Sequence, residues 1–433
     1  MNAVIIARPL LHELLGALLR GDRTTILSSV GVARWQGNAE LLVRSVDGGG
    51  PLLVWSGADD LSPPRALPED CLGVLLVGRG ALRGQAAGFI RAGHAIEPVH
   101  VLKVVGAGMH TCELHRQTPA RPDITAALAP PASRWSRTIG ALGLGVWTRL
   151  TRLRYGIVGL GRTGSIVAHM LARLGVRHLT LVDPDTVERH NLGEMTGITE
   201  SAIGFAKVDA LGAALARGRG AVPEVLRIRN SITHLRSLHA AQACDVLFAC
   251  VDHDAARLAL AAIATLYSRL LIDIGAGVHG HGAERVMGAD VRLVLPGRCL
   301  LCMGGLRDED AARRVLASPQ AERTFYAGRD WQAERAGSLH SLNQLSAAIA
   351  LRLLEDLVAE RIRDSVWAHL EFDAHGRLSV SYPSPAPADG SQPCPMCRWS
   401  ASGDDGLAHI ASVLLRNSDP SPTRDTTGES VGA

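Results

Sequence analysis

A glycine-rich turn followed by an acidic residue is the segment of this chain whose spacing indicates chemistry most clearly. Gly159, Gly161 and Gly164 form a G-x-G-x-x-G pattern directly after an apolar run, and Asp183 lies 19 residues beyond Gly164. Such glycines allow a tight turn and close approach of the backbone to phosphate, at the positive end of a helix. Asp183 lies where a carboxylate accepts hydrogen bonds from ribose hydroxyls. The segment predicts a nucleotide-binding β-α-β unit.

Three polar residues further along the chain fit the same site. Asp252 follows the apolar run Val246–Cys250, and the carboxyl ends of parallel strands meet in one crevice, so Asp252 and Asp183 should converge. A carboxylate beside polyphosphate requires a cation, so Asp252 is a candidate Mg²⁺ ligand. Lys207 would stabilise the departing pyrophosphate. Each has a structural alternative: Asn191 as a turn cap, Lys207 as a solvated helix lysine, and Asp252 as the N-cap of the next helix.

Four cysteines form two C-x-x-C pairs that predict a structural zinc site. Their thiolates would supply the four ligands of a closed tetrahedral Zn²⁺ centre, and the residues are Cys299, Cys302, Cys394 and Cys397. The alternatives are two unrelated pairs, or one redox pair. Zinc at this position would tie the C-terminal part of the chain back to the domain core, and its binding would be coupled to folding.

The elements that position these residues follow an alternating strand and helix pattern. Residues 151–400 predict a Rossmann-like, doubly wound α/β domain with a mostly parallel sheet and the four-cysteine zinc site. Residues 1–120 predict a small α+β domain, with a helix at Leu10–Leu19 and a strand at Thr25–Ala33. Residues 121–150 are expected to be a linker and an arginine-bearing helical segment. Residues 401–433 are a C-terminal tail whose last part is expected to be disordered.

Composition limits the classes of partner. A formal charge of +3 is too small to indicate a nucleic-acid partner, and no apolar run approaches the length of a membrane helix. The N-terminus has no signal-peptide pattern and the cysteines are too few for a disulfide scaffold. We therefore expect a cytoplasmic protein without nucleic-acid or membrane partners.

The combined motifs resemble the ThiF/MoeB family, whose adenylation domain is related to ubiquitin-activating enzymes. The similarity spans roughly Ser133 to Arg398 and includes Arg134-Trp135-Ser136-Arg137, which is similar to the R-x-x-R element that precedes the domain. The resemblance implies a homodimer that uses MgATP to adenylate the C-terminal carboxylate of a ubiquitin-like protein, a sulfur-carrier protein or a peptide. It assigns ribose to Asp183 and phosphate to Asn191 and Lys207. It assigns magnesium to Asp252, and the phosphates of the partner subunit to Arg137.

The sequence departs from the family pattern at several positions. Arg162-Thr163 replace Gly-Gly, so Arg162 would either clash or add a phosphate contact. Glu194 stands where an arginine is usual, with Arg189 as a candidate for compensation, and His253 replaces an asparagine. An inactive subunit that binds a ubiquitin-like partner is therefore an alternative function. A nicotinamide-dependent oxidoreductase is another, but it leaves Lys207 without a role.

Two further questions concern the cysteines and the first domain. No cysteine lies between Met303 and Pro393, where thioester-forming relatives carry their nucleophile, so adenylation without an enzyme thioester is predicted. Cys244 and Cys250 are expected to be core thiols, which leaves Cys71 and Cys112 as weak candidates for a thioester-forming nucleophile.

The first domain lacks the H-x-H of JAB-type metalloproteases. It is expected to be a degenerate JAB-like or substrate-recognition module.

Overall fold

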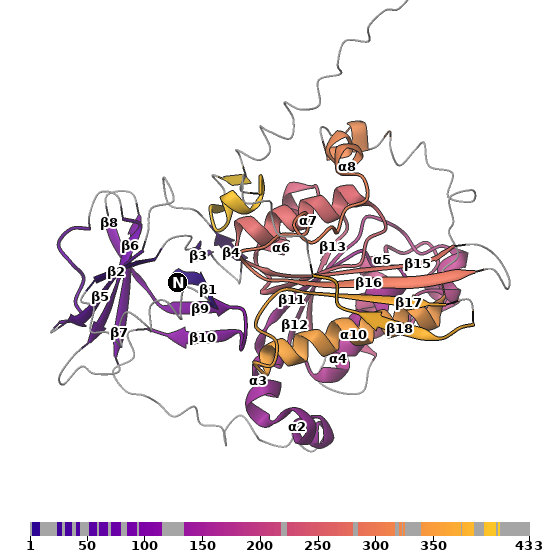
Figure 1. The fold of residues 1–433 in the computed structure, drawn as a ribbon, viewed down its shortest axis with the longest axis horizontal. Helices are drawn as coiled ribbons and strands as arrows, with labels where there is room; N and C mark the ends of the chain where they lie inside the picture. Colours follow the sequence, from indigo (N-terminus) through magenta and orange to yellow (C-terminus); the bar gives the residue numbers. More distant parts are fainter. Residues whose placement is uncertain are drawn as a thin grey trace, which may run out of the picture.

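The computed structural model describes most of the chain. The described residues are 2–8, 24–27, 31–36, 40–43, 52–58, 60–67, 71–78, 85–92, 95–114, 134–217, 223–279, 285–316, 320–322, 324, 339–373, 375–384, 394–403 and 406–407. They form an N-terminal β unit and a larger α/β unit, which lie side by side in Figure 1.

An eight-stranded sheet is the centre of the α/β unit, in the order β13-β12-β11-β14-β15-β16-β17-β18. Its strands are β11 (Arg154–Val158), β12 (His178–Val182), β13 (Glu224–Ile228), β14 (Val246–Ala249), β15 (Leu270–His279), β16 (Val286–Val294), β17 (Val366–Phe372) and β18 (Leu378–Ser381). The first five are parallel and the last three pair antiparallel. The chain reverses its direction across the sheet between β11 and β14, where doubly wound sheets bind ligands.

Helices cover both faces of this sheet (Figure 1). They are α4 (Arg162–Leu174), α5 (Lys207–Ala216), α6 (Leu235–Gln242), α7 (Asp254–Leu266) and α10 (His340–Val358). A further helix, α8 (Glu309–Leu316), packs against α7. The central strands are buried along almost their whole length because helices lie on either side, which explains their continuous apolar sequence. Two short helices, α2 (Ser136–Leu142) and α3 (Leu144–Arg152), lead into β11.

The N-terminal unit contains two five-stranded sheets. One has the order β10-β9-β1-β3-β4, with β1 (Asn2–Ala7), β3 (Gly31–Gln36), β4 (Glu40–Val43), β9 (Val101–Val105) and β10 (His110–Glu113). The other has the order β2-β5-β6-β7-β8, with β2 (Thr24–Leu27), β5 (Leu52–Ala58), β6 (Gly73–Gly78), β7 (Ala86–Ala92) and β8 (Ala95–Val99). Val4 and Ile6 pack between the two sheets, whereas Ile5 points the other way into the core of the α/β unit.

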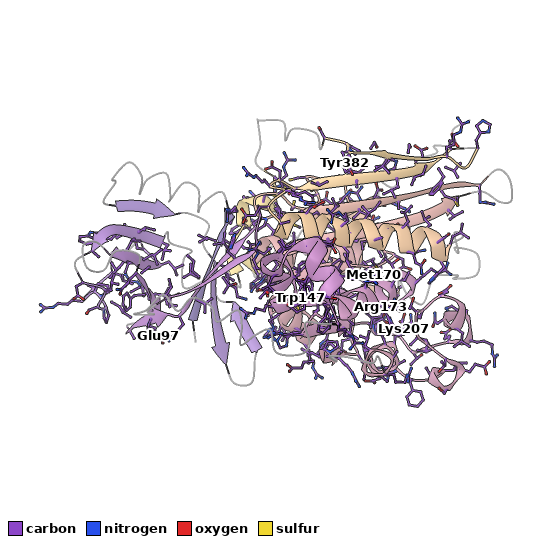
Figure 2. The ribbon with its side chains drawn as sticks, turned by 90° about the horizontal axis from the view of Figure 1, so that it is seen from below. Glu97, Trp147, Met170, Arg173, Lys207 and Tyr382 are labelled. Atoms are coloured by element: carbon purple, nitrogen blue, oxygen red, sulfur yellow. The ribbon has the colours of Figure 1, made fainter. Side chains whose placement is uncertain are left out.

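The contact between the two units lies at the amino ends of the parallel strands. Lys103 Nζ lies 2.7 Å from Asp245 Oδ1, directly before β14, and Asp245 also accepts a hydrogen bond from the Arg154 backbone. A second contact lies just after the C-terminal end of α10, where Arg8 and His110 both pair with Glu360. The N-terminal unit therefore docks at the edge of the sheet opposite to the carboxyl ends. In Figure 2, Glu97 of this unit and Lys207 of the α/β unit lie far apart.

The alternation of strands and helices predicted for the α/β unit is present, and the apolar run Val246–Cys250 contains β14. The expected single strand at Thr25–Ala33 is wrong, because β2 and β3 in this region belong to different sheets. The expected helix at Leu10–Leu19 lies outside the described residues, as does nearly all of the tail. No helix of the described part of the chain has the length and apolar character needed to cross a membrane.

Candidate functional site

The glycine turn after β11 is built by close backbone approach. Gly159 has a φ of 85°, and a Cβ there would lie 2.5 Å from the carbonyl oxygen of Cys250 at the end of β14. A Cβ on Gly164 would overlap the carbonyl oxygen of Gly159. A Cβ on Gly161, in contrast, would meet no atom within 4 Å. Gly159 and Gly164 are thus required by the fold, whereas Gly161 leaves open space at the first turn of α4.

Asp183 is fixed at the carboxyl end of β12, next to this turn. Its carboxylate is only 4% exposed and accepts hydrogen bonds from the backbone of Leu160 (2.6 Å) and of Asp185 (2.9 Å). Burial raises the pKa of Asp183 to about 6, although Lys207 and the two backbone donors oppose this rise. The carboxylate therefore lies against the glycine turn, where the ribose of a bound nucleotide is expected.

Lys207 lies beside the carboxylates of Asp183 and Asp185. Its Nζ donates to Asp185 Oδ2 at 2.8 Å, and its backbone N–H donates to the Asp185 carbonyl. Burial lowers the pKa of Lys207, but attraction to Asp183, Asp185 and Asp252 outweighs burial and raises it. Lys207 is therefore a fixed cation among three carboxylates. The structure brings together Asp183, which follows β12, Asp252, which follows β14, and Lys207, which begins α5.

The residue after Asp252 determines how α7 begins. His253 is the N-cap of α7, and its ring Nδ1 accepts a hydrogen bond from the Ala256 backbone at 3.2 Å. The alternative role of Asp252 as this N-cap is therefore wrong. A histidine fills the capping role here at the position where the family usually has asparagine, and Asp252 precedes the helix on the crevice side.

Two departures from the family pattern compensate each other. Arg162 Nη2 lies 3.2 Å from Glu194 Oε1 in a half-buried ion pair, and Glu194 Oε2 also lies 3.5 Å from Asn191 Nδ2. Asn191 itself accepts a hydrogen bond from the Glu188 backbone, so the alternative role as a turn cap is present in the structure. Arg189, the candidate for compensation, is instead exposed and pairs with Glu200 at 3.8 Å.

The second replaced glycine, Thr163, also has a structural partner. Its hydroxyl donates to Asn343 Oδ1 at 2.6 Å and connects α4 to α10. Arg162 and Thr163 therefore fit the loop without a clash, because each side chain is held by a polar partner from a distant segment.

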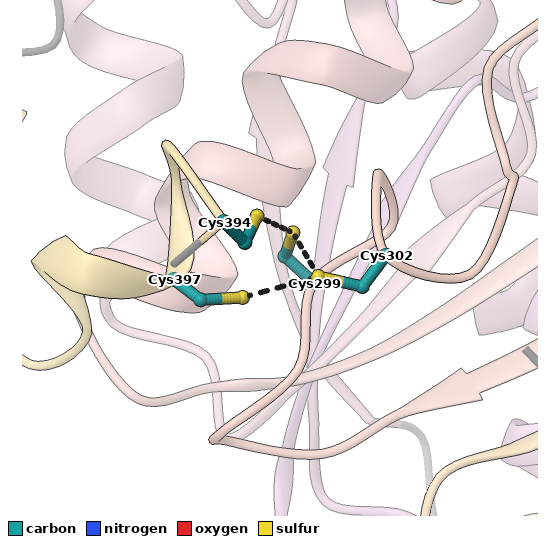
Figure 3. A group of neighbouring side chains, drawn as sticks. All are labelled: Cys299, Cys302, Cys394 and Cys397. Carbon is teal, nitrogen blue, oxygen red and sulfur yellow. Dashed lines mark hydrogen bonds between the residues drawn. The ribbon is translucent and has the colours of Figure 1, made fainter. Parts of the chain in front are cut away.

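The four cysteines of the two C-x-x-C pairs converge (Figure 3). Their sulfur atoms all lie within 4.8 Å of one another, with separations of 3.6 Å for Cys299–Cys302 and for Cys299–Cys394 and 3.5 Å for Cys302–Cys397. A tetrahedral Zn²⁺ with Zn–S bonds of about 2.3 Å places sulfurs about 3.8 Å apart. The cluster therefore has the dimensions of a zinc site, and among the described residues it is the one group found that could hold a metal.

The remaining cysteines that the structure describes with their side chains are poor nucleophiles. Cys71 and Cys244 are buried. Burial raises the pKa of Cys244 to about 11 and raises that of Cys250 further. The Cys112 side chain lies outside the described residues. These environments agree with a protein that forms no thioester through Cys71, Cys244 or Cys250.

Arg137 does not reach the crevice of its own chain. It is exposed at the start of α2, a helix without buried residues that projects from the domain in Figure 1. The neighbouring Trp135 anchors this segment, because its Nε1 donates to the Arg173 carbonyl at 2.8 Å. The structure thus places Arg137 on a protruding helix, apart from the other predicted site residues.

A polar pocket of about 290 Å³ was not predicted from the sequence. It lies over β15, β16 and β17 and includes Arg257, Asp290, Arg292 and His369. Alternation of polar residues along β16 and β17 is a signal that could have indicated it. The sequence alone could not predict that β16 pairs with β17, because paired residues such as Asp290 and His369 are about 80 residues apart.

The order and pairing of the strands, with helices on both faces, define a Rossmann-like α/β domain. Residues 135–322 match the model of the ThiF family. This part of the chain is a ThiF-family domain.

Curated relatives extend this similarity at low identity. Ubiquitin-like modifier-activating enzyme 5 of Oryza sativa subsp. japonica is 27% identical over 211 residues, which are 44% of this chain and 46% of that protein. Adenylyltransferase and sulfurtransferase MOCS3 of Bos taurus is 33% identical over 145 residues, which are 33% of this chain and 32% of that protein. The chain thus spans about half or less of the length of these two relatives.

Solved structures of E. coli MccB are also similar. The complex with ATP superimposes with a TM-score of 0.46 at 16% identity, over 61% of this chain and 74% of that chain. The complex with N-formylated MccA gives a TM-score of 0.47 at 17% identity, over 61% of this chain and 74% of that chain. These superpositions are too loose to transfer residue roles.

Proposed function

We propose that this protein is an ATP-dependent adenylyltransferase that activates the C-terminal carboxylate of a ubiquitin-like protein, a sulfur-carrier protein or a peptide. The observation that carries the proposal is the position of Lys207, a buried cation among Asp183, Asp185 and Asp252 beside a phosphate-binding glycine turn. The match to the ThiF family and the similarity to enzymes named as activating or adenylylating support it.

In the proposed reaction, an oxygen of the acceptor carboxylate attacks the α-phosphorus of ATP. The bond from the α-phosphorus to the oxygen that bridges the α- and β-phosphates breaks, and pyrophosphate leaves with that oxygen. The products are an acyl adenylate and pyrophosphate, and no proton transfer is required because the acceptor carboxylate is already ionised at neutral pH. Lys207 would stabilise the negative charge that develops on the leaving group.

Each remaining site residue has one role in this proposal. Asp183 accepts hydrogen bonds from the ribose hydroxyls, and Gly161 leaves room for the phosphates at the N-terminus of α4. Asp252 and the nearby carboxylates would hold Mg²⁺, which would screen the polyphosphate charge from them. Arg137 would reach the phosphates bound to the partner subunit of a homodimer.

A second candidate function is an inactive subunit that binds a ubiquitin-like partner. It is motivated by Glu194, a negative charge near the expected phosphates. The ion pair with Arg162 weakens this argument, because Arg162 neutralises Glu194 at 3.2 Å. A nicotinamide-dependent oxidoreductase gives no role to Lys207 or Asp252, and we favour it least.

The test is ATP–pyrophosphate exchange with the zinc-loaded protein and candidate carrier proteins. We expect carrier-dependent exchange that falls by about 10²–10³-fold in Asp252→Ala and in Lys207→Ala, the loss typical of removing one electrostatic group from a preorganised site. Asp209→Ala is the matched control, because this carboxylate lies two residues after Lys207 and pairs with Arg227 at the surface.

Binding measurements separate the alternatives. MgATP binding without exchange for any carrier would favour the inactive subunit. Preferential binding of NAD over MgATP would contradict an adenylyltransferase. Circular dichroism of each variant checks that the lost activity does not come from lost folding.

A further inference from the structure

A buried amide interrupts the apolar stripe of α10. Apolar residues are buried at the spacing of one helix face, at Ala347, Ala350, Leu354 and Leu357. Asn343, one turn before Ala347, continues this stripe and is only 4% exposed. An amide is unfavourable in such a position unless its polar atoms are hydrogen-bonded, whereas an apolar side chain would pack there without that requirement. The partners of Asn343 therefore indicate what the amide does.

The two polar atoms of this amide contact different helices. Asn343 Nδ2 donates to the Leu339 carbonyl at 2.8 Å, and Asn343 Oδ1 accepts from the Thr163 hydroxyl at 2.6 Å. Because a backbone carbonyl can only accept, the contact with Leu339 requires the amide NH₂ group on that side. The amide oxygen must then face Thr163, and the hydroxyl must be the donor. The proton of the Thr163 hydroxyl is therefore committed to α10.

Thr163 lies in the first turn of α4, at the proposed phosphate site. This helix has no side-chain cap. Ser165 is the first residue of α4 whose N–H bonds back within the helix, to the Gly161 carbonyl at 3.1 Å. The N–H groups of residues 162–164 precede it and have no intrahelical acceptor, as at the start of any α-helix. These are the donors that the proposed function directs at phosphate oxygens.

Contacts from three sides hold this first turn in place. Gly164 packs so closely on the turn after β11 that a Cβ would overlap a backbone carbonyl oxygen. On another side, Ser165 Oγ accepts a hydrogen bond from the Thr196 N–H at 2.9 Å. The bond from Thr163 to Asn343 holds the turn to α10, which packs against α4 (Figure 1). Donors fixed in this way before binding need no reorganisation when phosphate arrives.

We propose that Asn343 is a positioning residue for the phosphates of ATP. It acts through Thr163, whose hydroxyl proton is already used, and it holds the N–H groups of the first turn of α4 in the direction of the phosphates. The proposed ribose ligand, Asp183, is held by other contacts, with the backbones of Leu160 and Asp185. The hydrogen bond should therefore affect binding of the triphosphate and leave binding of the nucleoside unchanged. This inference rests on the proposed adenylation function.

The test compares MgATP and adenosine binding by calorimetry in the full-length, zinc-loaded protein. Thr163→Val removes the hydroxyl with little change in shape, whereas Thr163→Ser keeps it. We expect MgATP affinity to fall about fivefold in Thr163→Val, the effect of losing one neutral hydrogen bond. Adenosine affinity should stay unchanged in this variant, and Thr163→Ser should bind both ligands as the wild type does.

A double variant separates positioning from stability. Thr163→Val leaves the buried oxygen of Asn343 without its donor, so the melting temperature should fall. Adding Asn343→Leu makes both partners apolar, which can be nearly neutral, so the melting temperature should recover. MgATP affinity should remain about fivefold reduced in the double variant, because an apolar contact is not directional. Recovery of MgATP affinity together with the melting temperature would reveal a merely structural role and would overturn the inference.

Thr265→Val is the matched control. The Thr265 hydroxyl is buried and donates to the Ala261 carbonyl at 2.8 Å, one residue before the C-terminal end of α7 at Leu266. Since α7 begins beside the crevice, Thr265 lies at the far end of this helix. The control should lower the melting temperature without changing MgATP affinity. Equal loss of MgATP and adenosine affinity in Thr163→Val, or equally weak MgATP binding in Thr163→Ser, would contradict the inference.

Pyrophosphate exchange with carrier proteins is measured separately on the wild type. Weaker MgATP binding in Thr163→Val, without exchange for any carrier, would contradict the proposed activity while supporting the role of Asn343. Exchange in the wild type, with unchanged MgATP affinity in Thr163→Val, would support the activity and overturn this inference. A wild type that binds no MgATP would overturn both.

Discussion

Asp183 combines a buried position with a proposed role that requires its charge. Burial raises the pKa of its carboxyl to about 6 in the free protein. The folded pKa lies above the value of 3.8 for an unperturbed carboxyl. This group therefore stabilises the fold below pH about 4, and that contribution is lost as the pH rises through about 6. The proposed nucleotide binding should depend on pH in the opposite direction, because ribose hydroxyls would donate to the ionised carboxylate.

We predict that adenosine affinity falls by about tenfold between pH 8 and pH 5, since at pH 5 about nine-tenths of Asp183 would be protonated. Adenosine is the suitable ligand because it has no phosphate that titrates in this range. Calorimetry in buffers of different ionisation enthalpy should detect proton release on binding near pH 6. Asp183→Asn should bind weakly with no pH dependence; an unchanged pH profile in this variant would exclude Asp183 as the titrating group.

At the scale of elements, the glycine turn and α4 permit a matched pair of substitutions. Gly164→Ala should destabilise the protein, because the new Cβ would overlap the Gly159 carbonyl and would force α4 away from β11. Gly161→Ala should fold normally, because its Cβ would meet no atom within 4 Å.

These variants should separate stability from nucleotide binding. We expect the melting temperature to fall in Gly164→Ala, and in Gly161→Ala we expect MgATP affinity to fall without a change in melting temperature. Equal melting temperatures for both variants would contradict the packing described for this turn.

The four-cysteine cluster joins two segments that are distant in sequence, so we predict that it binds zinc and that the metal contributes to folding. The purified protein should contain one zinc per chain by elemental analysis. Cys394→Ser with Cys397→Ser should abolish zinc binding and lower the melting temperature, because apparent zinc binding energies of about 10–16 kcal/mol are coupled to folding. Cys250→Ala is the control and should retain zinc. A metal-free protein with an unchanged melting temperature would contradict a structural zinc.

At the scale of the whole molecule, the position of Arg137 predicts shared active sites. It lies on the projecting α2, whereas Asp252 lies in the crevice of its own chain. If each crevice receives Arg137 from its partner, Arg137→Ala and Asp252→Ala should each be inactive alone. After mixed refolding in equal amounts, about a quarter of wild-type exchange activity should return, because half of the dimers are mixed and each contains one intact site.

Complementation would be absent if the chain worked as a monomer, and sedimentation would then show no dimer. Arg134→Ala, two residues from the start of α2 and stacked on Trp135 at 5.8 Å, is a control for general disturbance of this segment. The Arg134→Ala variant should be active in pyrophosphate exchange by itself, without mixed refolding.

The docked N-terminal unit is also a property of the whole molecule. It contacts the amino ends of the parallel strands through Lys103 and Asp245, away from the carboxyl ends that carry the predicted nucleotide-binding residues. A recognition role for this unit would therefore involve a large acceptor or a second subunit rather than direct contact with the nucleotide of its own chain.

The sequence by itself determined the nucleotide turn, the strands around it and the pairing of the four cysteines into one cluster. These features depend on short spacings, such as Gly159 to Gly164, or on residue types that have one common chemistry, such as C-x-x-C. The apolar run Val246–Cys250 placed β14, because a strand that is covered on both faces of a sheet has a continuous apolar sequence.

Only the tertiary structure decided how distant residues combine. Arg162 was expected to clash or to contact phosphate, but it neutralises Glu194, and His253 rather than Asp252 caps α7. The polar pocket over β15, β16 and β17 depends on the register of these strands, whose residues are far apart in sequence. Such contacts are set by strand pairing and by packing against α10. A change of register by one residue would turn every side chain of a strand to the other face of the sheet. For this reason neither this pocket nor the docking of the N-terminal sheets could be predicted from local sequence.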